Sequence, residues 1–412
     1  MRIVDVSAFY APRGGGVRTY VEAKLRAAPR LGHELVVIVP GEQNEIVERA
    51  PGAIMASLAS PNLPVDRRYR YFDDQKALHR LLDQWRPDHV EASSPWSSAT
   101  MVGRWQGPAS RSLVMHSDPL AAYAYRWFGG IASTETIDRW FNWFWSHLRG
   151  LGHLFDTVVC ANSNLAQRLR EGGIEGVQTV PMGVEAGLFS PGRRSSELRS
   201  SALASLGLPP DGVLLVGAGR FSTEKRWDMV IRAAGDAARS RQVGLLLAGD
   251  GATRSRLERL SRRLPTVGLL PNLGDRTELA RLLASVDALI HGCEAETFCM
   301  VAAEARASGI PLIVPDRGAA GDHRIGGIGS VYRSGSRRAL KQAIVDFIDR
   351  GPELQRAAAA RASDARTMDE HFTDLFARYG ALHPRPTQRF AIPSCSSMPE
   401  TLVGASVAGG VF

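Results

Sequence analysis

Short apolar segments alternate with longer stretches of helical periodicity along most of the chain. The apolar segments are nearly continuous runs of Val, Leu and Ile, which is typical of strands buried on both faces of a sheet. Their alternation with helices predicts parallel sheets joined by crossover helices. In the first half, we expect strands at residues 2–7, 34–40, 88–92, 112–117, 157–162 and 178–181. In the second half, we expect them at residues 213–217, 244–248, 266–270, 288–291 and 312–315.

A change in composition separates the two halves. The chain becomes rich in Ser, Arg, Pro and Gly after residue 190, which predicts a linker over residues 191–212. We therefore expect one domain over residues 1–190 and a second over residues 213–365, a reasonable division of 412 residues. Residues 385–412 are again rich in Ser, Pro and Gly with little periodicity, so we expect a low-complexity tail there.

Composition and charge exclude several classes of protein. Hydrophobic residues make up 44% of the chain, but no apolar run approaches the ~18 residues of a membrane span. The four cysteines lack CxxC spacing, which argues against a disulfide framework or a zinc site and favours a cytoplasmic setting. The net charge of +8 favours anionic partners such as nucleotide phosphates or acidic lipid headgroups. No nucleic-acid-binding motif is present, so we expect no nucleic-acid partner.

The most informative motif is the segment from Glu296 to Glu304, which lies between two apolar segments. A strand, a turn, a helix and a second strand are expected in that order. Eight residues along a helix axis would separate the two carboxylates by roughly 12 Å. A helix N-terminus between them would present free N–H groups to a diphosphate, with a hydroxyl-rich group at each side. A solvated acidic helix face would show the same spacing.

In each half, one glycine-containing loop follows the first predicted strand. Residues 14–16 are three glycines, which would leave backbone N–H groups accessible to an anion. In the second half, Gly219 precedes Arg220 and Lys225, two cations that could neutralise a diphosphate leaving group. Neither loop is a P-loop or a complete dinucleotide fingerprint. A turn and ordinary surface charge would explain each loop taken alone.

Two features of the first half indicate a binding surface. His116 ends a predicted strand, at the edge where open parallel sheets bind ligands, although an isolated His is often structural. Residues 123–155 contain ten aromatic side chains with three arginines among them. This composition suits a membrane interface as well as a core helix with a large apolar face. The aromatic side chains cannot all lie on one narrow stripe, so we expect some of them to be exposed.

In this order, the motifs resemble glycosyltransferase family 4, the retaining nucleotide-sugar enzymes with the GT-B fold. The resemblance extends over about residues 1–379 and also includes residues 32–34, 181–191 and 307–311. It implies an α/β fold of two Rossmann-like, doubly wound domains that face a central cleft. The first domain would bind the acceptor and receive the last helix, residues 366–380, and the second would bind the donor.

The resemblance also implies a role for each matching residue. Arg220 and Lys225 match the diphosphate-binding pair, Glu304 the carboxylate that binds the ribose, and Glu296 the one near the sugar ring. His116 would contact the sugar or the acceptor and completes the expected catalytic set. The other expected donor contacts are Gly15, Gly16, Thr297, Phe298, Cys299, Met300 and Val301.

Two positions depart from the pattern of the family. Cys299 and Arg226 stand where many relatives carry Gly. The side chain of Cys299 would narrow the space at the helix start and change the pose of the donor sugar.

The resemblance implies a retaining hexosyltransferase that needs no cofactor beyond its nucleotide-sugar donor. No DxD-type pair is placed to hold a divalent ion, so Arg220, Lys225 and the helix dipole would stabilise the leaving diphosphate. No strong candidate for a covalent nucleophile is present, which favours a same-face substitution. The sequence leaves open whether the donor is a UDP-sugar or a GDP-sugar such as GDP-mannose.

The acceptor and the reaction class have alternatives. The aromatic segment, the basic residues 67–71 and the pI of about 9.6 favour a lipid-linked acceptor and peripheral contact with the cytoplasmic face of an anionic membrane, with a soluble acceptor as the alternative. A sugar-nucleotide 2-epimerase would use the same fold without an acceptor. A non-enzymatic module that binds a membrane surface or nucleic acid is a third reading, and a nicotinamide oxidoreductase is disfavoured because no complete fingerprint exists.

Overall fold

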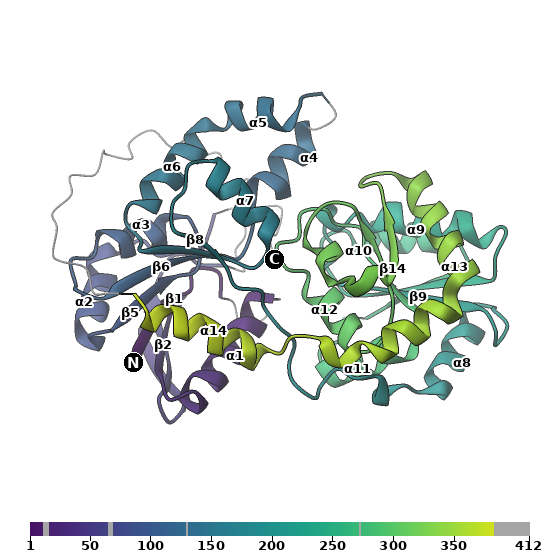
Figure 1. Cartoon of the computed structure of the whole chain (residues 1–412), viewed down its shortest axis with the longest axis horizontal. Coiled ribbons are helices and arrows are strands. Elements are labelled where there is room, and N and C mark those ends of the chain that lie inside the picture. The colour runs from purple at the N-terminus through teal and green to yellow at the C-terminus, as the bar shows by residue number, and fades with distance from the viewer. Residues whose placement is uncertain (11–15, 65–68, 129–130, 272, 383–412) are drawn as a thin grey trace. The chain divides into compact units, whose positions relative to one another are not determined.

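The computed structural model describes residues 1–10, 16–64, 69–128, 131–271 and 273–382 (Figure 1). The low-complexity tail expected over residues 385–412 lies outside the described residues, as does Gly15. The chain forms two α/β units. The N-terminal unit comprises Met1–Pro181 and the described residues from Asp369 onward, and the C-terminal unit comprises Met182–Met368.

The first unit ends at Pro181 rather than at the expected residue 190. Val184 forms a parallel bridge with Thr367, and its N–H donates to the carbonyl of Arg366 over 2.9 Å. A Cβ on Gly183 would lie 2.1 Å from the carbonyl carbon of Thr367, so glycine permits this close approach. Residues 182–190 therefore pack with the second unit.

The N-terminal unit contains an eight-stranded sheet in the order β3-β4-β2-β1-β5-β6-β7-β8. Its strands are β1 (Arg2–Val6), β2 (Glu34–Gly41), β3 (Glu45–Ala50), β4 (Ala53–Ala59), β5 (His89–Ala92), β6 (Ser110–Met115), β7 (Thr157–Cys160) and β8 (Val177–Thr179). All six strands expected in this half are present. Successive strands are added on both sides of β1, so the strand order reverses between β1 and β5.

The expectation of wholly parallel sheets is wrong at one edge. β3 runs antiparallel to β4, and the sequence pattern predicted neither strand. The side chains of β3 are exposed along its whole length and include Glu45 and Glu48, so the strand lacks the apolar run on which the prediction depended. Charged side chains on an edge strand oppose pairing with other chains.

Nine helices flank this sheet in the described part of the unit, and one turn is π-helical. They are α1 (Gly16–Arg30), α2 (Gln75–Trp85), α3 (Ser97–Arg104), η1 (Leu120–Ala124), α4 (Tyr125–Phe128), α5 (Thr134–Trp140), α6 (Asn142–Gly152), α7 (Ser163–Glu171) and α14 (Met368–Gly380), with η1 the π-helical turn. Local capping fixes several starts: α7 begins at Ser163 because the Asn162 side chain accepts from the N–H of Leu165 over 2.7 Å. In Figure 1, α14 (yellow) lies beside α1 on the N-terminal unit.

A buried charged cluster joins α1 and α14 to this sheet. Lys24 Nζ lies 2.9 Å from Asp5 Oδ2 and 2.5 Å from Glu91 Oε2, and the three side chains are fully buried. The Tyr379 hydroxyl donates to Glu91 Oε2 over 2.7 Å, and Ser93 Oγ donates to Asp5 Oδ1 over 2.8 Å. Burial and the nearby Glu91 raise the pKa of Asp5 against the opposing effect of Lys24. The cluster therefore couples helices far apart in sequence to the centre of the sheet.

The C-terminal unit contains a six-stranded parallel sheet in the order β11-β10-β9-β12-β13-β14. The strands are β9 (Val213–Ala218), β10 (Val243–Ala248), β11 (Val267–Leu270), β12 (Ala288–Ile290), β13 (Leu312–Pro315) and β14 (Gly329–Tyr332). The five expected strands are present, and the short, half-buried edge strand β14 was not predicted. The order reverses between β9 and β12, which makes this the point where an open sheet binds ligands.

Six α-helices of the described residues surround this second sheet. They are α8 (Ser196–Ser205), α9 (Trp227–Ala238), α10 (Arg254–Ser261), α11 (Arg276–Ser285), α12 (Met300–Ala307) and α13 (Arg337–Ala360). Phe221 and Trp227 fill the core between α9, α13 and the sheet together with Phe347. Among the residues that the structure describes, no helix is both long and apolar enough to cross a membrane.

The linker expected over residues 191–212 is wrong, because α8 occupies its middle and packs within the C-terminal unit. Ser195 caps this helix by accepting from the N–H of Leu198 over 3.2 Å. Arg199 binds the buried Asp287 with two nitrogens, at 2.8 and 3.3 Å. The Ser and Arg content that indicated a linker thus serves helix capping and ion pairing.

Substitution of Lys24 tests the buried cluster. Lys24→Met would leave two carboxylates buried without a cation, so we expect the free energy of unfolding of the N-terminal unit to fall by about 3–5 kcal/mol in urea denaturation. Lys76→Met, on the exposed face of α2, is the matched control and should change it by less than about 0.5 kcal/mol. Equal stability of the two variants would contradict the role of the cluster.

Candidate functional site

The two loops that carry most of the predicted donor residues lie next to each other at the switch point of the C-terminal sheet. One loop follows β9 and includes the 3-10 turn Thr223–Lys225, and the other follows β12 and ends at α12. Because β9 and β12 are neighbours, their carboxyl ends meet at the same edge. A Cβ on Gly292 would lie 2.6 Å from the carbonyl oxygen of Lys225, so this glycine permits the close approach of the loops.

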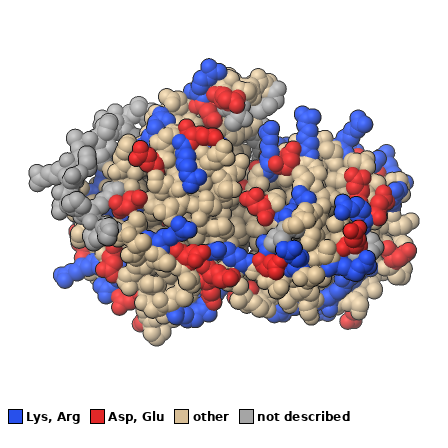
Figure 2. All heavy atoms as spheres, in the orientation of Figure 1, with Lys and Arg blue, Asp and Glu red and all other residues tan. Residues whose placement is uncertain are grey.

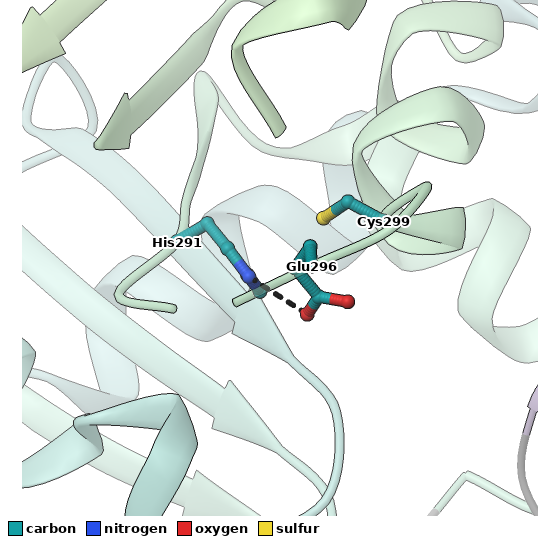
Figure 3. A group of neighbouring side chains, drawn as sticks. All are labelled: His291, Glu296 and Cys299. Atoms are coloured by element: carbon teal, nitrogen blue, oxygen red, sulfur yellow. Dashed lines mark ion pairs between the residues drawn. The ribbon is translucent and has the colours of Figure 1, made fainter. Parts of the chain in front are cut away.

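An ion pair joins the two loops. Lys225 Nζ donates to Glu296 Oε1, and His291 Nε2 lies 3.0 Å from the same oxygen (Figure 3). Burial alone would lower the pKa of Lys225, but the Glu296 carboxylate outweighs it and raises that pKa. Burial would raise the pKa of Glu296, but Lys225 and His291 outweigh it and lower that pKa below its usual range. Both groups therefore stay charged at neutral pH.

Arg220 lies in the same loop as Lys225. Its Nη2 lies 3.8 Å from Glu224 Oε1, and its carbonyl accepts from the Trp227 indole N–H over 2.9 Å. Trp227 is buried in the core, so this hydrogen bond fixes the backbone of the loop at Arg220. The structure thus brings Lys225 and Glu296 together from motifs 71 residues apart, and Arg220 lies in the loop that carries Lys225.

Glu304 is buried on α12 and is paired with a residue that sequence reasoning missed. Arg276 Nη2 donates to Glu304 Oε1 over 2.8 Å, and the Arg276 guanidinium also lies 5.2 Å from the centre of the Phe189 ring. Burial raises the pKa of Glu304, although Arg276 opposes this shift. One signal was available in the sequence: Arg276 is the first residue of α11, where a cation opposes the helix dipole.

The helix of the Glu296–Glu304 motif begins between the two carboxylates, as the sequence predicted. α12 starts at Met300, so Glu296, Thr297 and Phe298 lie in the preceding loop and the two carboxylates are not on one helix. The expected separation of roughly 12 Å assumed that both carboxylates lie on one helix, so that estimate is wrong. Met300 and Val301 form the first turn of α12, where backbone N–H groups lack intrahelical partners.

Cys299 adopts a backbone conformation that L side chains rarely take. Its φ is 65°, and it precedes α12 without a side-chain cap hydrogen bond. A glycine would adopt this conformation with less strain, since it has no Cβ. The thiol is buried, and burial raises its pKa well above the usual value, so it is protonated at neutral pH.

His116 and Gly16 belong to the N-terminal unit. Gly16 is the first residue of α1, and His116 follows β6 with its ring packed edge-on against Tyr20, 4.9 Å between ring centres. Burial lowers the pKa of His116 to about 4, so the imidazole is neutral at physiological pH. Their contribution to the site of the C-terminal unit stays a prediction.

The site contains one group of side chains with metal-ligating atoms among the described residues. The ligand atoms of His291, Glu296 and Cys299 all lie within 4.8 Å of one another (Figure 3). The ammonium of Lys225 already contacts the Glu296 carboxylate, and the Cys299 thiol is held protonated. A cation would have to displace the first and ionise the second, so these residues do not fit a resident metal.

Acid titration tests the ion pair of Lys225 and Glu296. The folded-state pKa of Glu296 is lowered, so its contribution to stability is present above the pKa of an unfolded glutamate and is lost as pH falls. We expect Glu296→Gln to reduce the free energy of unfolding by about 3 kcal/mol at pH 7. This difference from the unsubstituted protein should shrink below about pH 5. Thermal unfolding at a series of pH values measures it, and a difference constant down to pH 4 would contradict the pairing.

Comparison with known proteins finds two matching family models and several similar proteins. The family model "Glycosyl transferases group 1" matches residues 199–364, and the model "Glycosyltransferase Family 4" matches residues 14–187. A GDP-mannose-dependent alpha-(1-6)-phosphatidylinositol dimannoside mannosyltransferase of Mycobacterium tuberculosis is 30% identical over 400 residues, which cover 93% of this chain and 97% of the relative. A GDP-mannose-dependent alpha-mannosyltransferase of the same species is 30% identical over 95% of this chain and 99% of its own length.

Solved structures share the fold at lower identity. Sucrose-phosphate synthase from Thermosynechococcus elongatus superposes with a TM-score of 0.72 at 19% identity, over 92% of this chain and 99% of that chain. The Anabaena protein HepE in complex with UDP superposes with a TM-score of 0.68 at 16% identity, over 93% of this chain and all of that chain.

Proposed function

The chain belongs to glycosyltransferase family 4 and has the GT-B fold, and from this premise we propose that it transfers mannose from GDP-mannose to a phosphatidylinositol-mannoside type of lipid. The family and fold predicted from the motifs are confirmed. Membership makes the chain a retaining hexosyltransferase with a nucleotide diphosphate sugar as its donor. The identity of the sugar and of the acceptor is the proposal, supported by the printed activities of relatives that span nearly the whole chain.

The observation that carries the proposed donor site is the Lys225–Glu296 ion pair at the switch point of the C-terminal sheet. The diphosphate binds between Lys225, Arg220 and the first turn of α12, where cations and free N–H groups converge. Glu304, one turn into α12, accepts hydrogen bonds from the ribose hydroxyls and is held in place by Arg276. Glu296 faces the transferred sugar. Carboxylates therefore flank the diphosphate along the donor, in the order sugar, diphosphate, ribose.

This arrangement favours departure of the diphosphate. As the anomeric C–O bond breaks, negative charge develops on the leaving phosphate oxygen, and Lys225 and Arg220 stabilise it in a site that is largely shielded from water. The Glu296 carboxylate keeps Lys225 protonated until the phosphate takes its place. The acceptor oxygen attacks the anomeric carbon on the face that the phosphate leaves, and its proton passes to the leaving phosphate oxygen. The anomeric configuration is retained, and no divalent ion is required.

A membrane contact of the N-terminal unit would bring a lipid acceptor to the enzyme. Three large apolar side chains on and between α4 and α5 are strongly exposed: Trp127 at 52%, Ile131 at 80% and Trp140 at 53%. Phe128 packs edge-on against Trp140, with ring centres 5.7 Å apart, so an aromatic contact joins α4 and α5. Exposed Trp beside Arg139 suits the interface of an anionic bilayer. Figure 2 shows acidic and basic side chains interspersed on the face drawn.

The aromatic segment expected from the sequence is thus divided between two roles. Phe144, Trp145 and Phe155 are buried in the core of the N-terminal unit, as the core-helix reading predicted. Trp127 and Trp140 are exposed, as the membrane reading requires.

The direct test of this function is release of nucleotide from a panel of UDP- and GDP-sugars, with and without vesicles that contain phosphatidylinositol mannosides. We expect release from GDP-mannose that depends on the lipid, and a mannosylated lipid whose new linkage retains the α configuration. Release without any acceptor would favour the 2-epimerase, and absence of release from every donor would overturn the proposal.

Glu304→Gln tests the proposed ribose contact in the same assay. Loss of a hydrogen bond to a charged group costs about 1.5–3 kcal/mol, so we expect the KM for GDP-mannose to rise about 10- to 100-fold. Glu278→Gln, which changes an exposed glutamate on α11, is the matched control and should leave KM unchanged. Equal KM values for the two variants would place the ribose elsewhere.

The membrane contact is tested by replacing the exposed aromatic side chains. We expect Trp127→Ser combined with Trp140→Ser to reduce sedimentation with anionic vesicles at least about tenfold, because two interfacial Trp anchors are lost. Binding of GDP should not change. Ile46→Ser, on the edge strand β3 of the same unit, removes a side chain of matching exposure (54%) and serves as the control. Vesicle binding equal to that of the control would contradict this surface.

A further inference from the structure

A second ion pair joins the two loops of the donor site beside the first. Arg226 follows Lys225 in sequence, and Glu294 precedes Glu296 by two residues. Arg226 Nε lies 3.0 Å from Glu294 Oε1 and 2.7 Å from Oε2, and Nη2 also donates to Oε1. The guanidinium therefore holds the carboxylate with two nitrogens, which fixes both distance and orientation. The pair is largely shielded from solvent.

The backbone of Arg226 is in an unfavourable conformation. Its φ is 51° and its ψ 34°, the left-handed region that favours glycine. Arg226 both ends the 3-10 turn that carries Lys225 and precedes α9. A non-glycine residue persists there only where its surroundings hold it, and the structure supplies that constraint through Glu294. An arginine where glycine would fit with less strain indicates that its side chain has a role.

The carboxylate partner is itself held by the loop that follows β13. The Glu294 carbonyl oxygen would lie 2.5 Å from a Cβ at Gly318, whose φ is 77°, so glycine permits this approach. Two residues along, the Glu296 carbonyl accepts from the N–H of Ala319 over 2.9 Å. Glu294 is thus a firm anchor for Arg226.

We propose that the Arg226–Glu294 pair positions Lys225 for the donor diphosphate, by keeping the two loops in register while Lys225 exchanges Glu296 for phosphate. This proposal rests on the donor site placed above. When phosphate competes for Lys225, the Lys225–Glu296 contact weakens, and the neighbouring pair is the described side-chain ion pair that still links these loops. Arg226 acts through Lys225 and does not contact the donor, so it is a positioning residue.

The two members of the pair differ in what their removal does to stability. Arg226→Gly relieves the strained backbone but leaves Glu294 without its cation, so these opposing effects should leave the thermal midpoint nearly unchanged. Glu294→Gln keeps the shape of the side chain and removes its charge. If the pair positions Lys225, both variants raise the KM for the donor about five- to twentyfold, and kcat at saturating donor changes less than twofold. A purely structural role would lower thermal stability and leave KM unchanged.

A double-substitution cycle completes the test. In Arg226→Gly combined with Glu294→Gln, the KM should equal that of the more impaired single variant, because the two residues act as one unit. Arg226→Lys keeps the charge but not the two-nitrogen contact, and should restore KM only in part. The matched control is Asp236→Asn, which disrupts a similar two-nitrogen pair between Arg337 and α9, with both contacts at 2.7 Å.

The outcomes separate this proposal from the proposed function. Glu294→Gln and Arg226→Gly with the KM of the Asp236→Asn control would overturn the positioning role. If the fold-changes in KM of the two single variants multiply in the double variant, the residues act independently, and that result would also overturn the positioning role. Absence of turnover by the unsubstituted protein with every nucleotide sugar would instead overturn the function on which the positioning role depends.

Discussion

The ion pair between Lys225 and Glu296 is the interaction on which the donor site depends. Each group is largely buried, and a buried charge is tolerated only with a partner, so each holds the other in its charged form. The sheet supplies the geometry, because the strands that precede the two loops are neighbours at the point where the strand order reverses. The pair thereby keeps a cation at the edge of the sheet where we propose that the diphosphate binds. Arg220 lies in the loop of Lys225, and Glu304 follows Glu296 in sequence and lies on α12, where Arg276 pairs with it. Arg226 pairs with Glu294 between the same two loops.

Local conformational rules are broken where this site is built. Cys299 and Arg226 both have left-handed backbone conformations although neither is glycine. Arg226 ends the turn that carries Lys225, and Cys299 ends the loop that carries Glu296. The third such residue among the described ones, Arg86, ends α2 in the N-terminal unit, where a left-handed residue at a helix end is ordinary. Strain concentrated in one site, and offset there by a two-nitrogen ion pair, is expected where function constrains the backbone.

The sequence predicted those parts of the fold that apolar runs specify. β9 and β10 are buried along almost their whole length and were found from their Val and Leu content, whereas β3 is exposed and β14 is short and half-buried, so neither has that signal. The prediction of a linker was wrong because Ser195 and Arg199 are residue types common in linkers, but here they act as a helix cap and an ion-pair partner.

The candidate site shows the same limit. Lys225, Glu296 and Glu304 belong to motifs and were recognised in the sequence, and the family they indicated is confirmed. Arg276, the partner of Glu304, and Glu294, the partner of Arg226, were not recognised in the sequence. Their contacts join residues 28 and 68 positions apart, which only the folded sheet brings together. The measurement that tests the account most directly is calorimetric titration of GDP into the unsubstituted protein and into Lys225→Gln. We expect the substitution to weaken GDP binding about 10- to 100-fold, because a charge-assisted contact to phosphate is lost. Equal affinity for GDP in the two proteins would contradict the placement of the diphosphate at Lys225.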